Sequence, residues 1–242
     1  MLRQHVANDP SVSRVTELQM RNWELRNAQR PASPRSPAQM VCDCVCISRM
    51  AGAGGEELAR ALADRLQWPL FDRDILTLMA EREPVRARLY EHLDECDLGW
   101  LEDMLHLIMV SEFARGQYFR QLTRTALTIA RKGNAIFLGR AVDLILPRDT
   151  GLRIRVIAPV TQCATRCAAE RGLTIEQATH EVELVERNRR RFVEHHFGRR
   201  AHDPMRYDLI LNMQHLTPRS AVESAVAALD VAGPAAADVA VE

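Results

Sequence analysis

The sequence predicts an α/β fold, with a parallel sheet covered by helices on both faces. Short apolar runs alternate with segments of helical periodicity, which is typical of strands joined by crossover helices. A loop with three glycines in four residues separates the first apolar run from the first helical segment. The 242 residues are enough for one medium domain or at most two small ones, and the content of 47% hydrophobic and 26% charged residues is that of a soluble globular protein.

Five apolar runs are short enough and sufficiently bounded by turn residues to be predicted as strands: 41–47, 69–72, 135–139, 153–159 and 207–212. Apolar residues recur at helical spacing between them, for example at Leu58, Leu62 and Leu66. This periodicity predicts helices over 56–67, 161–171, 174–197 and 218–229. Residues 73–132 show only helical periodicity, so they interrupt the alternation and are expected to form an insertion that covers a substrate.

The two ends of the chain are predicted to be disordered. Residues 1–40 are polar and end in "RPASPRSPAQ", where three prolines in seven residues prevent regular structure, although a short helix over 14–27 is possible. The tail 231–242 is rich in alanine and is expected to be loose. The sequence shows no cleavable leader and no run of about 18 apolar residues, so a cytoplasmic location is expected.

The formal net charge is zero, which gives no reason to expect nucleic acid or an anionic membrane as a partner. Cys42, Cys44 and Cys46 alternate along the first predicted strand, which places them on one face about 7 Å apart. That spacing is too long for a disulfide and poor for a shared zinc ion, so we expect buried apolar cysteines and no metal site.

The glycine loop has the layout of a phosphate-binding loop, because backbone amides and the start of a helix lie between strand and helix. A tight turn without a ligand is the alternative. The fingerprint G-x-x-x-x-G-K-[ST] requires a lysine and a hydroxyl where this chain has Gly55 and Glu56. Arg49 could carry the missing positive charge. Glu56 would repel phosphate unless magnesium or an arginine intervenes.

Arginines and an aspartate follow other predicted elements. Arg140 comes directly after the strand 135–139, where ligands bind in parallel sheets, but it could instead pair with Asp143. Asp72 could either contact a ligand or cap the next helix.

The helix 174–197 carries the run "ERNRRR". Arg187, Arg190 and Arg191 share one face of this helix at i, i+3 and i+4, whereas Arg189 points elsewhere. That basic face is either a solvated surface or a lid over a phosphate site.

Four segments in order, "ISRMAGAGGEELARALADRLQWPLFDRDIL", "KGNAIFLGRAVDLIL", "VIAPVTQCATRCAAERGLT" and "VERNRRRFVEHHFGRRAHDPMRYDLILN", resemble the cytidylate kinase-like family. This is a divergent branch of the P-loop nucleoside monophosphate kinases, and the likeness covers roughly residues 41–230. The resemblance implies a P-loop NTPase-type parallel sheet of about five strands, a helical NMP-binding insertion at 73–132 and a lid at about 174–205. It also implies transfer of the γ-phosphoryl group of ATP to CMP or dCMP, with Mg²⁺.

Matching positions to the family implies a role for each candidate residue. The ATP-binding residues would be Ser48, Gly52, Ala53, Gly54, Gly55 and Glu56. The acceptor would bind at Asp72 and Arg140, and the catalytic cations would be Arg49, Arg187, Arg189 and Arg190. The chain departs from the pattern at three positions, where Glu56 replaces a basic residue, Ala141 an acid and Leu78 an arginine.

The sequence therefore predicts a nucleoside monophosphate kinase whose partners are small-molecule nucleotides. Two alternatives stay open. A catalytically impaired nucleotide-binding regulator of the same fold is favoured by Glu56 and by the missing acceptor residues. A kinase for a different small acceptor would keep the same loop and lid.

Overall fold

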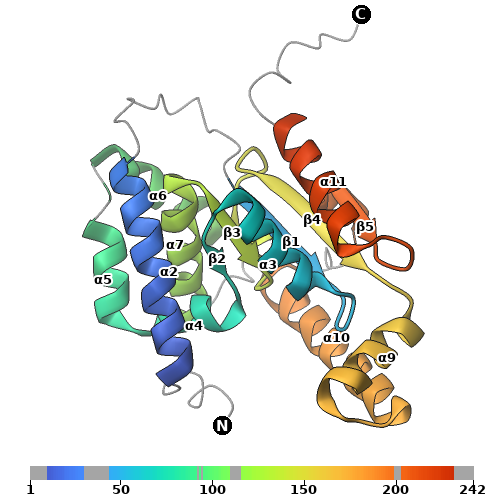
Figure 1. The fold of residues 1–242 in the computed structure, drawn as a ribbon. Coiled ribbons are helices and arrows are strands. Elements are labelled where there is room, and N and C mark those ends of the chain that lie inside the picture. The colour runs from blue at the N-terminus through green and yellow to red at the C-terminus, as the bar shows by residue number, and fades with distance from the viewer. Residues whose placement is uncertain are drawn as a thin grey trace, which may run out of the picture.

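The computed structural model describes residues 10–29, 44–91, 93, 95–109, 116–198 and 203–231. Five parallel strands form one sheet in the order β2-β3-β1-β4-β5. Their bounds are Cys44–Arg49 (β1), Leu70–Phe71 (β2), Ala135–Leu138 (β3), Leu152–Ile157 (β4) and Leu209–Asn212 (β5). The predicted α/β fold with a parallel sheet of five strands is confirmed, and all five predicted strands are present (Figure 1). Residues 41–43 of the first predicted strand lie outside the described residues.

Side chains of the central strand alternate between two hydrophobic cores, as the two-residue period of a strand requires. Cys44 and Cys46 enter one core together with Phe71 and Phe137. Val45 and Ile47 enter the other core. The two cysteines are buried and free, in agreement with the sequence-based expectation.

In its described residues, the predicted insertion contains four helices, α4 (Arg73–Glu81), α5 (Glu83–Glu91), α6 (Glu95–Met109) and α7 (Gln117–Lys132). They contribute to the core that contains Cys46 and gather on one side of the sheet (Figure 1). A buried ion cluster joins two of them, because Asp97 of α6 accepts hydrogen bonds from Arg131 and Lys132 of α7, both at 2.6 Å.

Helix α2 (Pro10–Gln29) lies within the predicted disordered extension and contains the short helix that the sequence allowed over 14–27. Its inward face packs beside α4, and Met20 and Trp23 are each only 1% exposed (Figure 1). Two polar contacts add to this packing: Gln19 accepts a hydrogen bond from the backbone of Leu70, and Glu24 pairs with Arg88. The apolar face of this helix consists of only a few residues at helical spacing, so the polar composition of the segment did not indicate it.

In the second half of the chain, strands and helices alternate again. Helices α3 (Gly55–Leu66) and α11 (Pro218–Val231) pack in the core that contains Val45, as do α9 (Val160–Arg171) and the first half of α10 (Ile175–Phe197). Short α8 (Val142–Ile145) follows β3, and a 3₁₀ turn, η2 (Pro204–Arg206), precedes β5.

Helix α10 provides most of the predicted lid. It begins at a capping box between Thr174 and Gln177, and it packs along α9. Its far end reaches the insertion, where His196 stacks on Phe119 with ring centroids 4.4 Å apart. Among the described helices, none is both long and apolar enough to cross a membrane.

Candidate functional site

The glycine loop connects β1 to α3 at the carboxyl edge of the sheet. Gly52 and Gly54 have φ values of 71° and 86°, in the left-handed region where a side chain is strained. A Cβ atom on Gly52 would lie 2.5 Å from the carbonyl oxygen of Cys163, and one on Gly54 would overlap the guanidinium of Arg166. Ala53 is fully buried beneath the loop. The glycines therefore allow both the turn and the close approach of α9.

Arg49 occupies the place from which the missing lysine would extend. A Cβ atom on Gly55 would lie 2.5 Å from Cβ and 2.7 Å from Cγ of Arg49, so the aliphatic stem of Arg49 fills that space. The guanidinium of Arg49 ends beside Gly139, at the carboxyl end of β3. The positive charge at the loop thus comes from the strand before the glycines instead of from the helix after them.

Glu56 is neutralised by this arginine. Nε and Nη2 of Arg49 donate to Oε1 of Glu56 at 3.0 and 2.8 Å. Burial raises the pKa of Glu56, but the charge and hydrogen bonds of Arg49 outweigh burial and leave the pKa below its ordinary value. The carboxylate is therefore ionised at neutral pH, and its charge is offset by an arginine. An arginine was one of the two groups, with magnesium, that we expected to prevent repulsion between Glu56 and phosphate.

The arginines of α10 do not form one functional face. Arg189 points inward, and its Nη1 donates to the carbonyl of Arg49 at 2.9 Å and to Glu186 at 3.0 Å. Burial lowers the pKa of Arg189, and the charge of Arg49 lowers it further. Arg187 and Arg190 are both exposed. The face defined by helical spacing is thus largely exposed, and Arg189 is the arginine of this run that contacts the end of β1.

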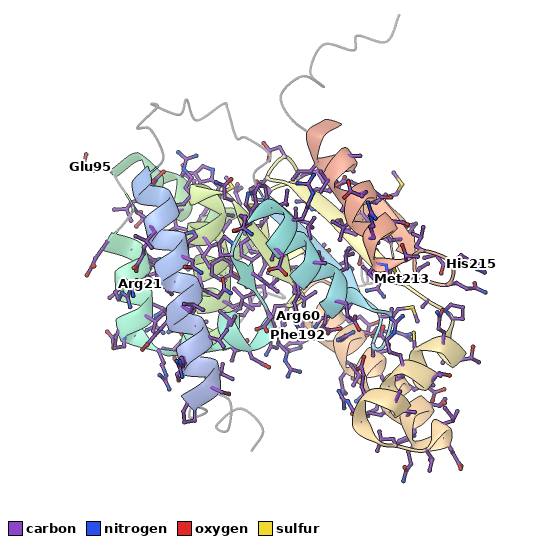
Figure 2. The ribbon with its side chains drawn as sticks, in the orientation of Figure 1. Arg21, Arg60, Glu95, Phe192, Met213 and His215 are labelled. Atoms are coloured by element: carbon purple, nitrogen blue, oxygen red, sulfur yellow. The ribbon has the colours of Figure 1, made fainter. Side chains whose placement is uncertain are left out.

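Two cavities meet at this helix. The first, the loop cavity, has a volume of about 310 Å³ and lies between the glycine loop, α3, α9 and α10. The second, the sheet-end cavity, has a volume of about 320 Å³ and is lined from the ends of β1, β3 and β4, from α10 and from the turn before β5. Arg60 of α3 lines the first and Phe192 of α10 the second (both labelled in Figure 2). Arg189 lines both cavities.

Arg140 enters the sheet-end cavity from a strained turn. Arg140 and Ala141 both have φ of 54°, which is unfavourable for residues other than glycine. Nη2 of Arg140 donates to Thr77 at 2.9 Å, and the guanidinium lies 5.8 Å from the ring centre of Tyr118 and 5.7 Å from that of Phe192. The insertion and α10 therefore hold this side chain together.

The alternative pairing of Arg140 with Asp143 is wrong. Asp143 instead accepts hydrogen bonds from Nη2 and Nε of Arg206, at 2.5 and 3.1 Å. Both side chains of that pair are nearly buried.

Asp72 has the capping role that the sequence left open. Its Oδ1 accepts hydrogen bonds from the backbone N–H groups of Asp74 and Ile75, each at 2.9 Å, at the start of α4. Within the described part of the chain, Asp72 is not among the residues that line either cavity, and neither is Arg187. Arg190, by contrast, lines the sheet-end cavity. Of the two departures at the acceptor side, Ala141 lines that cavity and Leu78 is buried.

Three residues that the sequence analysis did not select also contact the loop or its neighbours. Arg155 of β4 donates to Ser48 at 2.8 Å, and Arg166 of α9 donates to the carbonyl of Gly52 at 3.2 Å. Glu186 accepts a hydrogen bond from the backbone N–H of Ala51 at 2.9 Å. A signal for Arg155 existed, because an arginine near the carboxyl end of an apolar strand lies where ligands bind. Among the described residues, no three His, Cys, Asp or Glu side chains converge on a metal site.

Comparison with known proteins finds matches over most of the chain. The model of the cytidylate kinase-like family matches residues 44–215. The cytidylate kinase of Thermococcus kodakarensis is 28% identical over 116 residues, which are 48% of this chain and 59% of that protein. The chain thus matches less than two thirds of that relative's length. The cytidylate kinase of Pyrococcus furiosus is 24% identical over 195 residues, which are 80% of this chain and 91% of the relative.

A solved structure supports the fold. An uncharacterized protein from Eubacterium ventriosum superposes with a TM-score of 0.58 at 17% identity, over 78% of this chain and 98% of that one.

Proposed function

Because this chain belongs to the cytidylate kinase-like family, we propose that it is a phosphotransferase that moves the γ-phosphoryl group of ATP to CMP or dCMP. The observation that carries this proposal is the pair of adjoining cavities that share Arg189. A kinase of this kind must hold a donor and an acceptor nucleotide end to end, with positive charge where the phosphoryl group passes.

The loop cavity is the proposed donor site. The start of α3, which has no side-chain cap, and the left-handed glycines Gly52 and Gly54 favour an anion there. Arg166, which lies over Gly54, and Arg60 add positive charge at the same cavity. These groups would bind and orient the phosphates of ATP.

The sheet-end cavity is the proposed acceptor site. Arg140 is held in place by Thr77 and by two aromatic rings, so its guanidinium is oriented before any ligand arrives. Arg155 and Arg190 line the same cavity. A nucleoside monophosphate would bring its phosphate to these arginines.

Arg49 and Arg189 lie between the two sites and would neutralise the charge that develops on the transferred group. Phosphoryl transfer depends on position and positive charge more than on a general base. An acceptor phosphate is itself the nucleophile, so no side chain need remove a proton from it.

Magnesium fits the residues present at the loop. Glu56 offers an ionised oxygen ligand at the position of the hydroxyl in the fingerprint, and Mg²⁺ is commonly held by one or two carboxylates together with substrate phosphates. When bound, the ion would supply additional positive charge to the phosphates.

The test is a steady-state assay of the purified protein with ATP, magnesium and a panel of CMP, dCMP, UMP, AMP and GMP, with a control that lacks acceptor. We expect the highest kcat/KM with CMP or dCMP. Binding of ATP without phosphorylation of any acceptor would favour the regulator, and turnover restricted to another compound would favour a kinase for a different acceptor.

A further inference from the structure

A carboxylate from α10 occupies part of the glycine loop. Oε1 of Glu186 accepts hydrogen bonds from the backbone N–H of Ala51 at 2.9 Å and from Nη1 of Arg189 at 3.0 Å. Its other oxygen lies 3.7 Å from Nη2 of Arg155. Three donors of the kind that bind phosphate therefore surround one side-chain anion.

These donors crowd positive charge into a small space. Arg189 lies close enough to Arg49 for the like charge to lower its pKa, in addition to the effect of burial. Arg155 lines the sheet-end cavity together with both of them. Such a group of guanidinium ions favours an anion at its centre, and in the structure Glu186 is that anion.

The position of this carboxylate is also where the two cavities meet. Glu186 lines the sheet-end cavity, whereas Ala51 lines the loop cavity and Arg189 lines both. If ATP and an acceptor fill the two cavities, the phosphoryl group must pass close to the oxygen atoms of Glu186. A fixed carboxylate there would repel it.

We propose that the carboxylate of Glu186 is a stand-in for a substrate phosphoryl group, and that nucleotide binding displaces it. The vacated subsite, formed by the N–H of Ala51 with Arg155 and Arg189, then holds the phosphoryl group between the cavities. This inference rests on the proposed function, and it assigns Arg155 to the transferred phosphoryl group in addition to the acceptor phosphate. Because Glu186 lies on α10, its displacement also couples phosphate binding to a change at the lid.

Competition by an internal anion lowers the apparent affinity for the external one, since only the fraction of molecules with an open subsite can bind. A purely structural role for Glu186 has the opposite consequence. If the carboxylate served only to orient Arg189 and the loop, its removal would disorder the site and weaken phosphate binding.

The experiment compares the wild type with Glu186→Gln and Glu186→Ala by calorimetry, with inorganic pyrophosphate and ATP as probes. Pyrophosphate has no nucleoside, so its affinity reports on the anion subsite. Gln keeps an acceptor for the N–H of Ala51 while removing the charge, and Ala empties the subsite. Glu183→Gln is the matched control, because it removes one negative charge from an exposed position of the same helix.

We expect both Glu186 variants to bind pyrophosphate and ATP about tenfold more tightly or better, as removal of a charge-assisted competitor predicts. The Glu183 variant should match the wild type within about twofold, since an exposed charge in water contributes little. Equal or weaker binding by folded Glu186 variants would overturn the stand-in alone. Unfolding of both variants would show a structural role and would also overturn it. Absence of binding in every protein, wild type included, would overturn the proposed function and the stand-in with it.

Discussion

Restoring the fingerprint lysine should damage this loop instead of improving it. The backbone at Gly55 does not require glycine, because its φ is not in the positive range that side chains avoid. The obstacle in Gly55→Lys is Arg49, whose Cβ would lie 2.5 Å from the new Cβ, against 3.4 Å or more in ordinary contact. Both atoms are attached directly to backbone, so rotation of a side chain cannot separate them. Arg49 must therefore move and lose its contacts with Glu56.

The size of the effect follows from these contacts. Overpacking of this kind destabilises a protein by about 1–3 kcal/mol, so the variant should still fold. Misplacing one preorganised charge at a transferring group lowers turnover by roughly 10²–10³-fold. Arg49→Gly should have a similar effect, because it removes the same charge.

The double variant Arg49→Gly with Gly55→Lys has both the space and the charge of the ordinary fingerprint. We expect its kcat to exceed that of either single variant by about tenfold or more, which is the signature of two residues in direct contact. The measurement is a double-mutant cycle on kcat and kcat/KM for the acceptor that the panel identifies. If Gly55→Lys alone is as active as the wild type, or if the double variant is no better than the poorer single one, Arg49 does not replace the lysine.

Three further outcomes are expected. Arg189→Ala should lower kcat by roughly 10²–10³-fold, whereas Arg187→Ala, on the exposed face of the same helix, should stay within about twofold of the wild type; equal kcat values for the two variants in steady-state kinetics would refute the inward placement of Arg189. Trp23→Ala should reduce the free energy of unfolding by about 3–5 kcal/mol, as loss of a buried tryptophan does, and a Tm unchanged from the wild type would show that α2 does not dock. Burial raises the pKa of Asp97, but hydrogen bonds and charge from Lys132 and Arg131 outweigh it and lower the pKa overall. The stability from this ionised carboxylate is therefore present above the ordinary carboxyl range and is lost as pH falls through the lowered pKa. Asp97→Asn should lower the free energy of unfolding by about 3 kcal/mol near neutral pH and by progressively less in acid. Denaturant titrations that show the same difference between variant and wild type at neutral and at acid pH would contradict this.

The sheet was predictable because its signals are local. The period of two in β1 determines which side chains enter each core, and the glycines after Arg49 mark the carboxyl edge where a ligand can bind. The departures from the fingerprint at Gly55 and Glu56 left two possibilities open, in which either magnesium or an arginine offsets the charge of Glu56. In the structure an arginine, Arg49, offsets this charge. The conformation of its side chain cannot be inferred from residue spacing in the sequence.

The orientation of a helix was not predictable in the same way. Helical spacing shows that Arg187 and Arg190 share a face, but it does not reveal which face turns toward the rest of the protein. Arg189 turns inward because Glu186, one turn earlier, contacts the loop. Arg140 posed a similar difficulty, since its partner Thr77 belongs to the insertion, 63 residues away in the chain.

The sequence allowed a short helix over 14–27, but the docking of α2 on the domain was not predicted, for a different reason. Only a few of its residues are buried, and apolar Val15, Leu18 and Leu25 are exposed among polar residues, so the sequence shows no clear apolar face. Packing against α4 determines its structure, as it does for many helices with a weak intrinsic signal.

We propose a loop that lacks the usual lysine and still holds a phosphoryl donor beside an acceptor. The direct measurement follows the label from γ-labelled ATP in the presence of CMP and magnesium, with Gly54→Val as the comparison, because a side chain there would meet both a φ of 86° and the guanidinium of Arg166. We expect labelled CDP with the wild type and none with a folded Gly54 variant. Label that stays in ATP or appears only as free phosphate with the wild type, or equal transfer by both proteins, would contradict it.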